Sequence, residues 1–405
     1  MKQNSVLDRL RALLGPVAVS RDPQGLPRAV PDGTEALALV LRTAHEEHWR
    51  VRVEGRGTWM PLDAPADLAV STRGMDQVVR VDPADLVATV QAGAPLELVR
   101  RRLADHGMWL ALDPPGHAER TLGSVVATGS SGPLRLGFGP ARDQVLGCTV
   151  VTGEGRVIAP GGRVVKNVAG YDLTKLQVGG FGAFGVLCEL HLRLRALPRA
   201  DITFIARGSR DQLTAVGRDA RDANALPAAL ELLSPAVAVD SDWVLAARFV
   251  GTREAVAAEV RQFASTNELT WTELPADRAG SFWTMAGRAA LGAPVTLRLG
   301  TLVDGVDETI DLVTEQMGEG LVTAGAGNGM VRWSGEVGPD RIRSVRHVAA
   351  AREIPLTVER APWPIRRAVG HFGAYREGVG QLVQKLRETF DPGLRFAVAL
   401  EGSEA

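Results

Sequence analysis

Glycine residues gather in three separated segments, and in two of them hydroxyl residues stand beside the glycines, a combination suited to holding an anionic group. Gly55-Arg56-Gly57-Thr58 follows an expected strand, so its backbone N–H groups can converge on an anion while Thr58 adds a hydroxyl. A second segment, residues 121–132, follows Asp113-Pro114-Pro115-Gly116, and a third, residues 182–186, leads into another expected strand. Three such loops suit an extended ligand that carries a pyrophosphate. Three unrelated surface turns are the alternative.

Other phosphate-binding motifs fail on their context. Residues 180–185 read G-F-G-A-F-G and match the dinucleotide-binding pattern G-x-G-x-x-G, which must open a helix. Apolar and polar residues alternate from 186 to 195 instead, and this period of two predicts a strand. No G-x-x-x-x-G-K-[ST] motif and no G-x-S-x-G elbow is present, so a P-loop nucleotidase and an α/β-hydrolase are both unsupported.

The elements that would position these loops indicate an α+β fold. Leu37, Val40, Leu41 and Ala44 recur at helical spacing between two expected strands, and short strands are expected at 68–71, 78–81 and 87–91. Pro95 opens another helix that Gly107 ends. Because this order does not repeat as a βαβ series, we do not expect a doubly wound parallel sheet.

Glycine becomes less frequent after residue 200, which indicates a second domain. Strands are expected at 201–206, 237–250 and 294–303, and helices at 252–263 and 379–390. The predicted organisation is an N-terminal helical extension (1–27), a two-lobed domain (28–200), an α/β cap domain with an antiparallel sheet (201–355) and a C-terminal helical return (356–405).

Composition excludes several classes of function. Forty-six basic residues against 47 acidic ones give a net charge of −1, so nothing indicates binding to nucleic acid. Two cysteines are too few for an iron–sulfur cluster, which takes about four thiolates. No apolar run approaches the roughly 20 residues of a membrane helix, and the N-terminus lacks the pattern of a signal peptide. We therefore expect no transmembrane segment and a cytoplasmic protein.

The ordered set of segments resembles the PCMH-type, or vanillyl-alcohol-oxidase-type, FAD-binding family over about residues 28–198. Within that family the chain is most similar to the E-type FAD-binding subunits of bacterial glycolate oxidases. The similarity includes Asp113-Pro114-Pro115, residues 121–132, G-F-G-P-A-R-D-Q-V-L-G at 137–147 and V-T-G-E-G at 151–155. Its most distinctive part is K-N-V-A-G-Y-D-L at 166–173. The resemblance implies a two-lobed α+β domain with FAD extended between the lobes.

The resemblance also implies roles for individual residues. Gly55, Arg56, Gly57 and Thr58 would hold the pyrophosphate. The remaining residues that it assigns to the cofactor, along its central part and toward the adenine, are Pro114, Thr121, Gly123, Ser124, Thr128, Gly132, Gly185 and Val186. Relatives that attach FAD covalently carry a histidine in the first loop, whereas this chain has Trp59. The flavin is therefore predicted to be non-covalent.

Catalytic residues are suggested by the chemistry that dehydrogenation of a 2-hydroxy acid requires. The reaction needs a cation for the carboxylate, a base for the hydroxyl proton and the flavin as hydride acceptor. Lys166 and Tyr171 lie in an otherwise apolar, glycine-rich segment and are the candidates. The alternative is structural: Lys166 would pair with an ordinary carboxylate, and Tyr171 would be buried with its hydroxyl bonded to backbone.

Two departures from the family pattern affect the expected function. Active D-2-hydroxy-acid dehydrogenases of this superfamily often carry the metal motif H-x-G-x-G-N-x-H, and the similar segment here places Thr323 and Met330 at the histidine positions. No metal site is therefore predicted. An equal interpretation is that this segment is a glycine turn that resembles the metal motif by chance. At the C-terminus Leu394-Arg395-Phe396 replaces the N-P-G of the family, which leaves docking of the tail open.

The expected function is that of the FAD subunit of a glycolate oxidase-type complex that oxidises a small 2-hydroxy acid. The partners would be a second FAD subunit and an iron–sulfur subunit, and the complex could hold the chain at the inner face of the membrane. A self-sufficient FAD-dependent D-2-hydroxy-acid dehydrogenase and an assembly subunit that binds FAD for structure alone are the alternatives.

Overall fold

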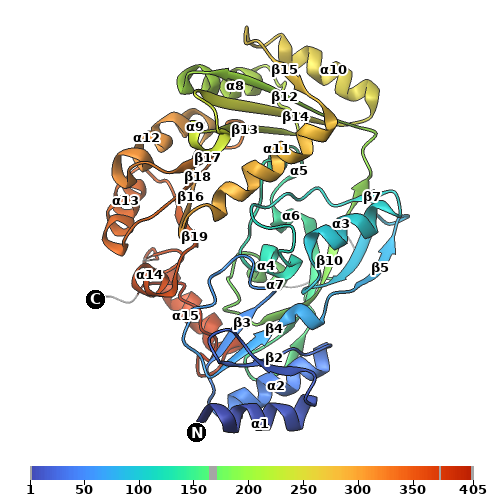
Figure 1. The fold of residues 1–405 in the computed structure, drawn as a ribbon, viewed down its shortest axis with the longest axis vertical. Coiled ribbons are helices and arrows are strands. Elements are labelled where there is room, and N and C mark those ends of the chain that lie inside the picture. The colour runs from blue at the N-terminus through green and yellow to red at the C-terminus, as the bar shows by residue number, and fades with distance from the viewer. Residues whose placement is uncertain (1, 164–170, 374, 403–405) are drawn as a thin grey trace.

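The structure is a computed structural model and describes residues 2–163, 171–373 and 375–402. Three β-sheets form its framework (Figure 1): a four-stranded sheet near the N-terminus, a five-stranded sheet beside it and an eight-stranded sheet in the second half of the chain. Helices pack on sheets that are largely antiparallel. The predicted α+β class is confirmed.

The first lobe is built on the four-stranded sheet. Its strand order is β1 (Val19–Arg21), β2 (Pro27–Ala29), β4 (Leu68–Ser71) and β3 (Val51–Glu54). Helices α1 (Lys2–Leu14) and α2 (Thr34–Glu46) pack on it, and the four apolar positions that predicted α2 are all buried. Because β1 pairs with β2 and Leu10 of α1 is fully buried in this core, the segment expected as an extension (1–27) is an integral part of the lobe.

The second lobe is built on the five-stranded sheet. Its strand order is β5 (Val78–Asp82), β6 (Val87–Gln91), β10 (Val186–Arg193), β8 (Val145–Val151) and β9 (Val157–Ile158). The helices of this lobe are α3 (Leu96–Ala104), α4 (Leu122–Ala127), α5 (Arg135–Phe138), α6 (Ala141–Gln144) and α7 (Leu173–Gln177). A short strand, β7 (Met108–Trp109), pairs with β11 (Arg195–Ala196). The strand predicted after Gly185 is therefore confirmed, whereas part of the loop predicted at 121–132 is helix α4.

The eight-stranded sheet, which we call the cap sheet, is antiparallel throughout. Its order is β15 (Thr272–Leu274), β12 (Ala200–Gly208), β14 (Trp243–Gly251), β13 (Ala229–Leu233), β17 (Leu321–Gly325), β18 (Met330–Gly335), β16 (Val295–Gly300) and β19 (Leu356–Arg360). The strand expected at 237–250 is shorter than predicted, because residues 235–238 form helix α9 (Pro235–Ala238). The boundary expected at 355 would also have cut off β19, which pairs with β16.

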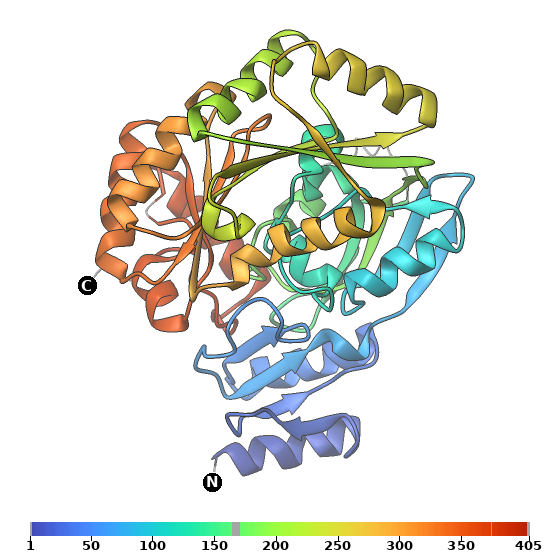
Figure 2. The same ribbon diagram turned by 45° about the horizontal axis from the view of Figure 1, so that its top comes forward.

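The two faces of the cap sheet differ. Helices α8 (Arg210–Asp222), α10 (Arg253–Ala264), α12 (Val306–Met317) and α13 (Pro339–Ala351) share one apolar core with alternate residues of the strands. On the other face, helix α11 (Ala276–Arg288) runs between the sheet and the second lobe (Figure 2). The backbone N–H of Gly116 donates to the carbonyl of Gly287 at the end of α11 (2.9 Å), which ties this helix to the second lobe.

The C-terminal segment returns to the first lobe. Helices α14 (Trp363–Val369) and α15 (Val379–Phe390) precede it. The Val51 N–H of β3 donates to the Arg395 carbonyl, and the Ala397 N–H donates to the Val51 carbonyl, both at 2.8 Å. The tail is therefore docked on the edge of the first sheet, which settles the question that Leu394-Arg395-Phe396 had left open.

Candidate functional site

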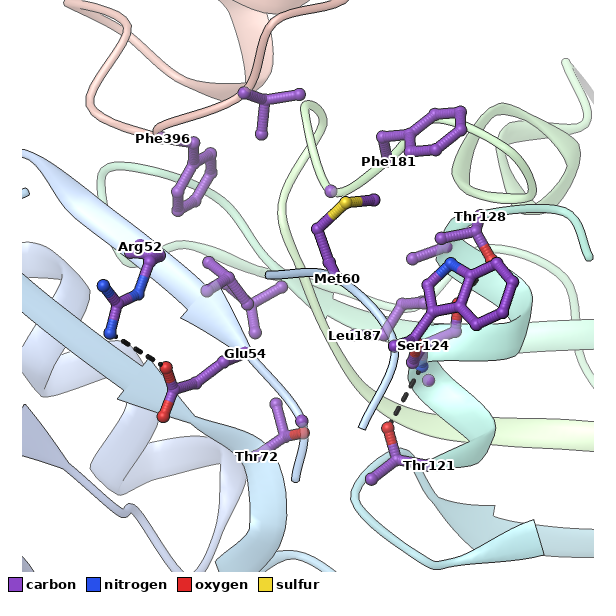
Figure 3. A pocket seen from close by; sticks show the side chains of 18 of the residues that line it. Arg52, Glu54, Met60, Thr72, Thr121, Ser124, Thr128, Phe181, Leu187 and Phe396 are labelled. Atoms are coloured by element: carbon purple, nitrogen blue, oxygen red, sulfur yellow. Dashed lines mark hydrogen bonds and ion pairs between the residues drawn. The ribbon is translucent and has the colours of Figure 1, made fainter. Parts of the chain in front are cut away.

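A cavity lies between the two lobes (Figure 3) and gathers most of the residues predicted to bind a cofactor. It encloses about 1150 Å³, counting the space open to solvent at its mouth. Ten of the twelve predicted residues line it: Gly55, Arg56, Gly57, Thr58, Thr121, Gly123, Ser124, Thr128, Gly185 and Val186. The other two, Pro114 and Gly132, line a second cavity, which is described below.

The loop after β3 forms one wall of this cavity. Gly57 has φ +71°, a conformation that favours glycine, and a Cβ there would lie 3.0 Å from Leu62 Cδ1. The Arg56 guanidinium forms ion pairs with Asp76 (3.1 Å) and with Glu119 (3.7 Å). These two carboxylates hold the Arg56 side chain in place and offset its positive charge.

Helix α4 forms the opposite wall. The Thr121 hydroxyl caps the helix by accepting a hydrogen bond from the Ser124 N–H (3.2 Å), as Figure 3 shows. A Cβ at Gly123 would lie 2.8 Å from both the Cβ and the carbonyl oxygen of Ala92. Glycine at this position therefore allows α4 to pack directly on the chain that leaves β6.

Aromatic side chains on this cavity were missed by sequence reasoning. Phe181 stacks on His371 with ring centroids 3.7 Å apart, and Phe396 of the C-terminal tail also lines the cavity. His371 is fully buried, which lowers its pKa to about 3, and its Nδ1 lies 2.7 Å from the Val358 carbonyl. The ring is therefore neutral, with Nδ1–H donating to that carbonyl. His371 and Phe396 come from the far end of the chain, and no local pattern marks them, whereas Phe181 lies in the G-F-G-A-F-G segment.

One layer of side chains separates the first cavity from the second. The Arg120 guanidinium lies 3.7 Å from the centre of the Trp59 ring, and Trp59 lines the first cavity. Arg120 also donates to the Pro115 carbonyl (2.6 Å), which belongs to the wall of the second cavity, and to Thr128 Oγ1 (2.7 Å), which belongs to the first. Burial lowers the pKa of Arg120 to about 9, so the guanidinium remains charged at neutral pH.

The second cavity lies between the second lobe, helix α11 and the cap sheet. Pro114, Pro115 and Gly116 line it on one side, and Trp283 of α11 lines it on another. The Trp283 indole N–H donates to the Thr203 hydroxyl of β12 (2.9 Å), so the helix is fixed to the sheet at this point.

The cap sheet contributes a polar stripe to this region. Side chains alternate between the faces of a strand, and while one set fills the apolar core, the other set faces the second lobe. Neighbouring strands thereby bring together Thr203, Glu231, Arg248, Arg298, Thr323, Arg332 and Glu359. Of these, Thr203, Glu231, Arg248, Thr323 and Arg332 line the second cavity. The stripe depends on the order of the strands in the sheet. The sequence therefore shows its polar residues one by one but does not predict that they lie together.

Glu359 anchors a buried cluster at one end of the stripe. Its carboxylate accepts from Arg332 Nε (2.8 Å), Arg298 Nη1 (3.3 Å) and the Ser130 hydroxyl (3.1 Å). Burial alone would raise its pKa, but the guanidinium groups, Arg332 foremost, outweigh burial and hold the pKa at about 2. Ser130 belongs to the second lobe, so the cluster joins that lobe to the cap sheet.

Two carboxyl groups in the second cavity have raised pKa values. Burial raises the pKa of Glu231 to about 8, with Arg332 opposing the rise and Asp113 adding to it. Burial also raises the pKa of Asp113, to about 6. The nearby charges of Arg248 and Arg100 oppose this rise, as does the Leu134 N–H, which donates to both carboxylate oxygens (3.1 Å). Carboxyl groups with raised pKa values in a cavity are candidates for proton transfer near neutral pH.

Of the two candidate catalytic residues from the sequence, the structure describes Tyr171 alone. Lys166 falls outside the described residues. Tyr171 is 96% exposed and lines neither cavity, so the alternative of a buried hydroxyl was wrong and its catalytic role gains no support. Thr323 does line the second cavity, opposite Arg332 in the strand register. Within the described ranges, no three His, Cys, Asp or Glu side chains are grouped as metal ligands would be.

The fold and the first cavity define a flavin-binding protein. Residues 28–160 match the family model described as "FAD binding domain", so the chain contains a domain of this family and FAD is its cofactor. The cavity fits this cofactor: glycines of the loop after β3 and of helix α4 admit close approach, Thr58 and Thr121 offer hydroxyl groups, and the Phe181 and Phe396 rings line it.

Among individual relatives, the chain is similar to the glycolate oxidase subunit GlcE of Escherichia coli, with 42% identity over 174 residues. That match covers 42% of this chain and 50% of the relative. The D-lactate dehydrogenase of Archaeoglobus fulgidus is 30% identical over 260 residues, which cover 62% of this chain and 57% of the relative. The chain thus spans about half the length of these curated relatives.

Solved structures show the same fold. An alkyldihydroxyacetonephosphate synthase superposes with a TM-score of 0.73 at 14% identity and covers 98% of this chain and 84% of that one. A 4-ethylphenol oxidase from Gulosibacter chungangensis superposes with a TM-score of 0.73 at 12% identity. The match covers 98% of this chain and 97% of the oxidase. Within the part of the chain that the structure describes, every helix is too short or too polar to span a membrane.

Proposed function

We propose that this chain is an FAD-dependent oxidoreductase of small 2-hydroxy acids and acts as the FAD-binding subunit of a glycolate oxidase-type complex. The observation that carries the proposal is the arrangement of the two cavities. A cavity that fits FAD lies one side-chain layer away from a cavity whose wall contains buried arginines and carboxyl groups. The similarity to a glycolate oxidase subunit and to D-lactate dehydrogenases supports the substrate class.

The residues of the first cavity would hold FAD without a covalent bond. The loop around Gly57 and the wall at Thr121–Ser124 would enclose the pyrophosphate, and the tail residue Phe396 would pack against the cofactor. When bound, FAD supplies the hydride acceptor of the reaction. Trp59 stands where covalent relatives carry a histidine, so acid precipitation should release the flavin into the supernatant. Retention of the flavin in the pellet would contradict this proposal. Because His371 also lines the cavity, a His371→Ala variant would then test its ring as the attachment point.

Electrons would have to leave this chain for a partner. Cys148 and Cys188 are both buried, and burial raises the pKa of each thiol to about 12, which is unsuited to ligating a cluster as thiolate. We therefore propose an iron–sulfur subunit and a second FAD subunit as the partners. A location at the inner face of the membrane would follow from that assembly.

A reduction titration of the isolated holoprotein tests the function. Under argon, glycolate and D-lactate are added in turn, with and without a chelator, and the flavin absorbance near 450 nm is followed. Bleaching that the chelator leaves unchanged supports metal-independent oxidation in this chain. Full turnover with a dye acceptor would favour a self-sufficient dehydrogenase over a subunit, and inertness towards every acid would favour an assembly subunit that binds FAD for structure.

A further inference from the structure

Two residues of the second cavity are placed for chemistry that the cofactor site does not need. Glu231 of β13 and Arg332 of β18 stand on the same face of the cap sheet and are only 5% and 6% exposed. Both line the cavity. Charged side chains are rarely buried to this extent unless they are paired or have a functional role.

The Arg332 guanidinium is held at two of its three nitrogens. Nε donates to Glu359 (2.8 Å), and Nη2 donates to the Ser131 carbonyl (2.6 Å). Nη1 has no hydrogen-bond partner among the described residues, although it belongs to a side chain in the cavity wall. A guanidinium fixed on one side and free on the other is suited to binding a carboxylate, because its orientation is set before the ligand arrives.

Glu231 differs from the other acids of the cavity. Asp201 is bound by Arg248 through two hydrogen bonds (2.8 and 2.5 Å), and Asp113 is bound by the Leu134 N–H. Glu231 has no ion pair within 4 Å among the described residues. The charged groups that act on it are Arg332, which favours its ionised form, and Asp113, which opposes it. The Thr323 side chain is the hydrogen-bond partner of Glu231. Glu97, the remaining acid of the wall, pairs with Arg100 (3.8 Å). Among the described residues, Glu231 is therefore the acid of this wall that neither a cation within 4 Å nor a backbone N–H holds.

We propose that the second cavity binds the 2-hydroxy acid, with the substrate carboxylate on Arg332 and the substrate hydroxyl on Glu231, which accepts the hydroxyl proton. This inference rests on the proposed function. The C2–H bond breaks and its electron pair leaves with the hydrogen as hydride to oxidised FAD. The O–H bond breaks towards the Glu231 carboxylate, the C2–O bond becomes a carbonyl, and the product is the 2-oxo acid.

The raised pKa of Glu231, about 8, agrees with this role. A carboxylate with an ordinary pKa is a weak base, whereas one that titrates near the working pH can accept a proton efficiently. The fraction of ionised Glu231 increases with pH up to about 8. The rate of flavin reduction should therefore rise about tenfold per pH unit below that value and level off above it.

Trp59 and Arg120 define where substrate and cofactor would meet. They form the layer between the cavities, and a Cβ at Gly116 of the second cavity would already lie 3.2 Å from the Trp59 ring. Hydride transfer needs contact between the acid and the flavin, so the proposal requires the flavin ring to lie beside this layer and the acid to meet it there.

Binding is tested with oxalate, a planar dicarboxylate that cannot be dehydrogenated, by calorimetric titration of the FAD-loaded protein. Arg332→Met should weaken oxalate binding about 10- to 100-fold, as expected for loss of a charge-assisted contact, and Arg332→Lys should recover part of it. Glu231→Gln should bind oxalate at least as tightly as the unchanged protein, because it removes a carboxylate that repels a dianionic ligand. The exposed-site variants Arg343→Met and Glu273→Gln serve as controls. Equal oxalate binding by Arg332→Met and the unchanged protein would overturn the binding site.

Proton transfer is tested by the rate of flavin reduction with glycolate and D-lactate between pH 5.5 and 9. Glu231→Gln should reduce the rate at saturating acid about 100-fold or more and abolish its rise with pH, with little change in the half-saturating concentration. A variant that keeps the full rate and the same pH profile would overturn the role of Glu231. If no acid reduces the unchanged protein, the proposed function fails together with proton transfer, while the oxalate titration still decides the binding site.

Discussion

The Arg120 guanidinium lies over the Trp59 ring, with its carbon 3.7 Å from the centre of the indole. Trp59 is 3% exposed and Arg120 is 1% exposed, although one comes from the loop after β3 and the other from the segment before α4. Cation–π contacts are strongest where water is excluded, as it is here. The stack thus fixes the two lobes to each other between the cavities.

Replacing Trp59 should test the strength of this layer. Trp59→Ala removes a buried ring and the partner of Arg120, so the free energy of unfolding should fall by about 3–5 kcal/mol. Trp59→Phe keeps an aromatic face and should cost less than half as much. Urea unfolding of the two variants, followed by circular dichroism, measures the difference. Equal losses in both would show that the aromatic face kept by phenylalanine does not support the layer.

Glu359 should contribute stability that depends on pH. Its pKa in the folded protein is about 2, below the value of about 4.3 for an unperturbed glutamate, so folding favours the ionised form. The contribution is complete above about pH 4.3 and is lost as the pH falls towards 2. Glu359→Gln should therefore destabilise the protein at pH 7 by about 3–5 kcal/mol, because Arg332 and Arg298 lose their buried counter-charge. The difference from the unchanged protein should shrink as the pH is lowered from 4 to 2.

A surface pair provides the control for Glu359. Arg343 and Asp340 lie 2.6 Å apart, but Asp340 has a 94% exposed side chain. Asp340→Asn should change the free energy of unfolding at pH 7 by less than about 1 kcal/mol. A loss as large as that of Glu359→Gln would mean that burial is not the source of the effect.

Gly57 should be essential for retention of the flavin. Its φ of +71° is unfavourable for a branched residue, and any Cβ would press on Leu62 beside the cavity. Gly57→Val should purify with less than a tenth of the normal flavin per chain, measured by absorbance after acid extraction. Gly25→Val is the matched control, because Gly25 has a similar φ of +83° with no atom within 4 Å of its Cβ position. Equal flavin loss in both variants would indicate a general effect of backbone strain.

The family resemblance indicated residues that line the first cavity, whereas nothing in the sequence indicated Glu231 and Arg332 in the second. The loop at 55–58 and the segment around Thr121 follow recognisable elements, and ten of the predicted residues share one cavity as a result. Glu231 and Arg332 lie 101 positions apart and carry no motif. Both line the same cavity because their strands, β13 and β18, are separated only by β17 in the cap sheet. Strand order is set by long-range packing, so residues of this kind are not identified by reading the chain locally.

The same reasoning applies to Tyr171. Its place in an otherwise apolar, glycine-rich segment suggested a catalytic role, but its side chain is exposed. Residue type and neighbours along the chain do not determine which side of a loop faces solvent. The helical prediction at 379–390 succeeded because its apolar face repeats locally, and α15 has the predicted bounds.

Asp391 should control docking of the C-terminal tail and, through it, the affinity for flavin. Its carboxylate accepts hydrogen bonds from the N–H groups of Arg395 and Phe396, both at 2.9 Å, and the residue is fully buried. These bonds turn the chain after α15 so that it reaches the edge of β3 and places Phe396 in the wall of the first cavity. Asp391→Ala leaves two buried donors without a partner, at a cost of about 1–3 kcal/mol for each.

The expected result of Asp391→Ala is an increase of about tenfold or more in the dissociation constant of FAD, together with faster proteolytic cleavage after α15. Asp391→Asn keeps one acceptor oxygen and should give an intermediate value. Asp242→Ala, at an exposed acid of the cap domain, is the control and should leave both quantities unchanged. Flavin affinity is measured by fluorescence titration of the apoprotein, and cleavage by mass spectrometry after brief protease treatment. If the tail becomes cleavable while flavin affinity stays normal, Phe396 packs the cavity wall without contributing to cofactor binding.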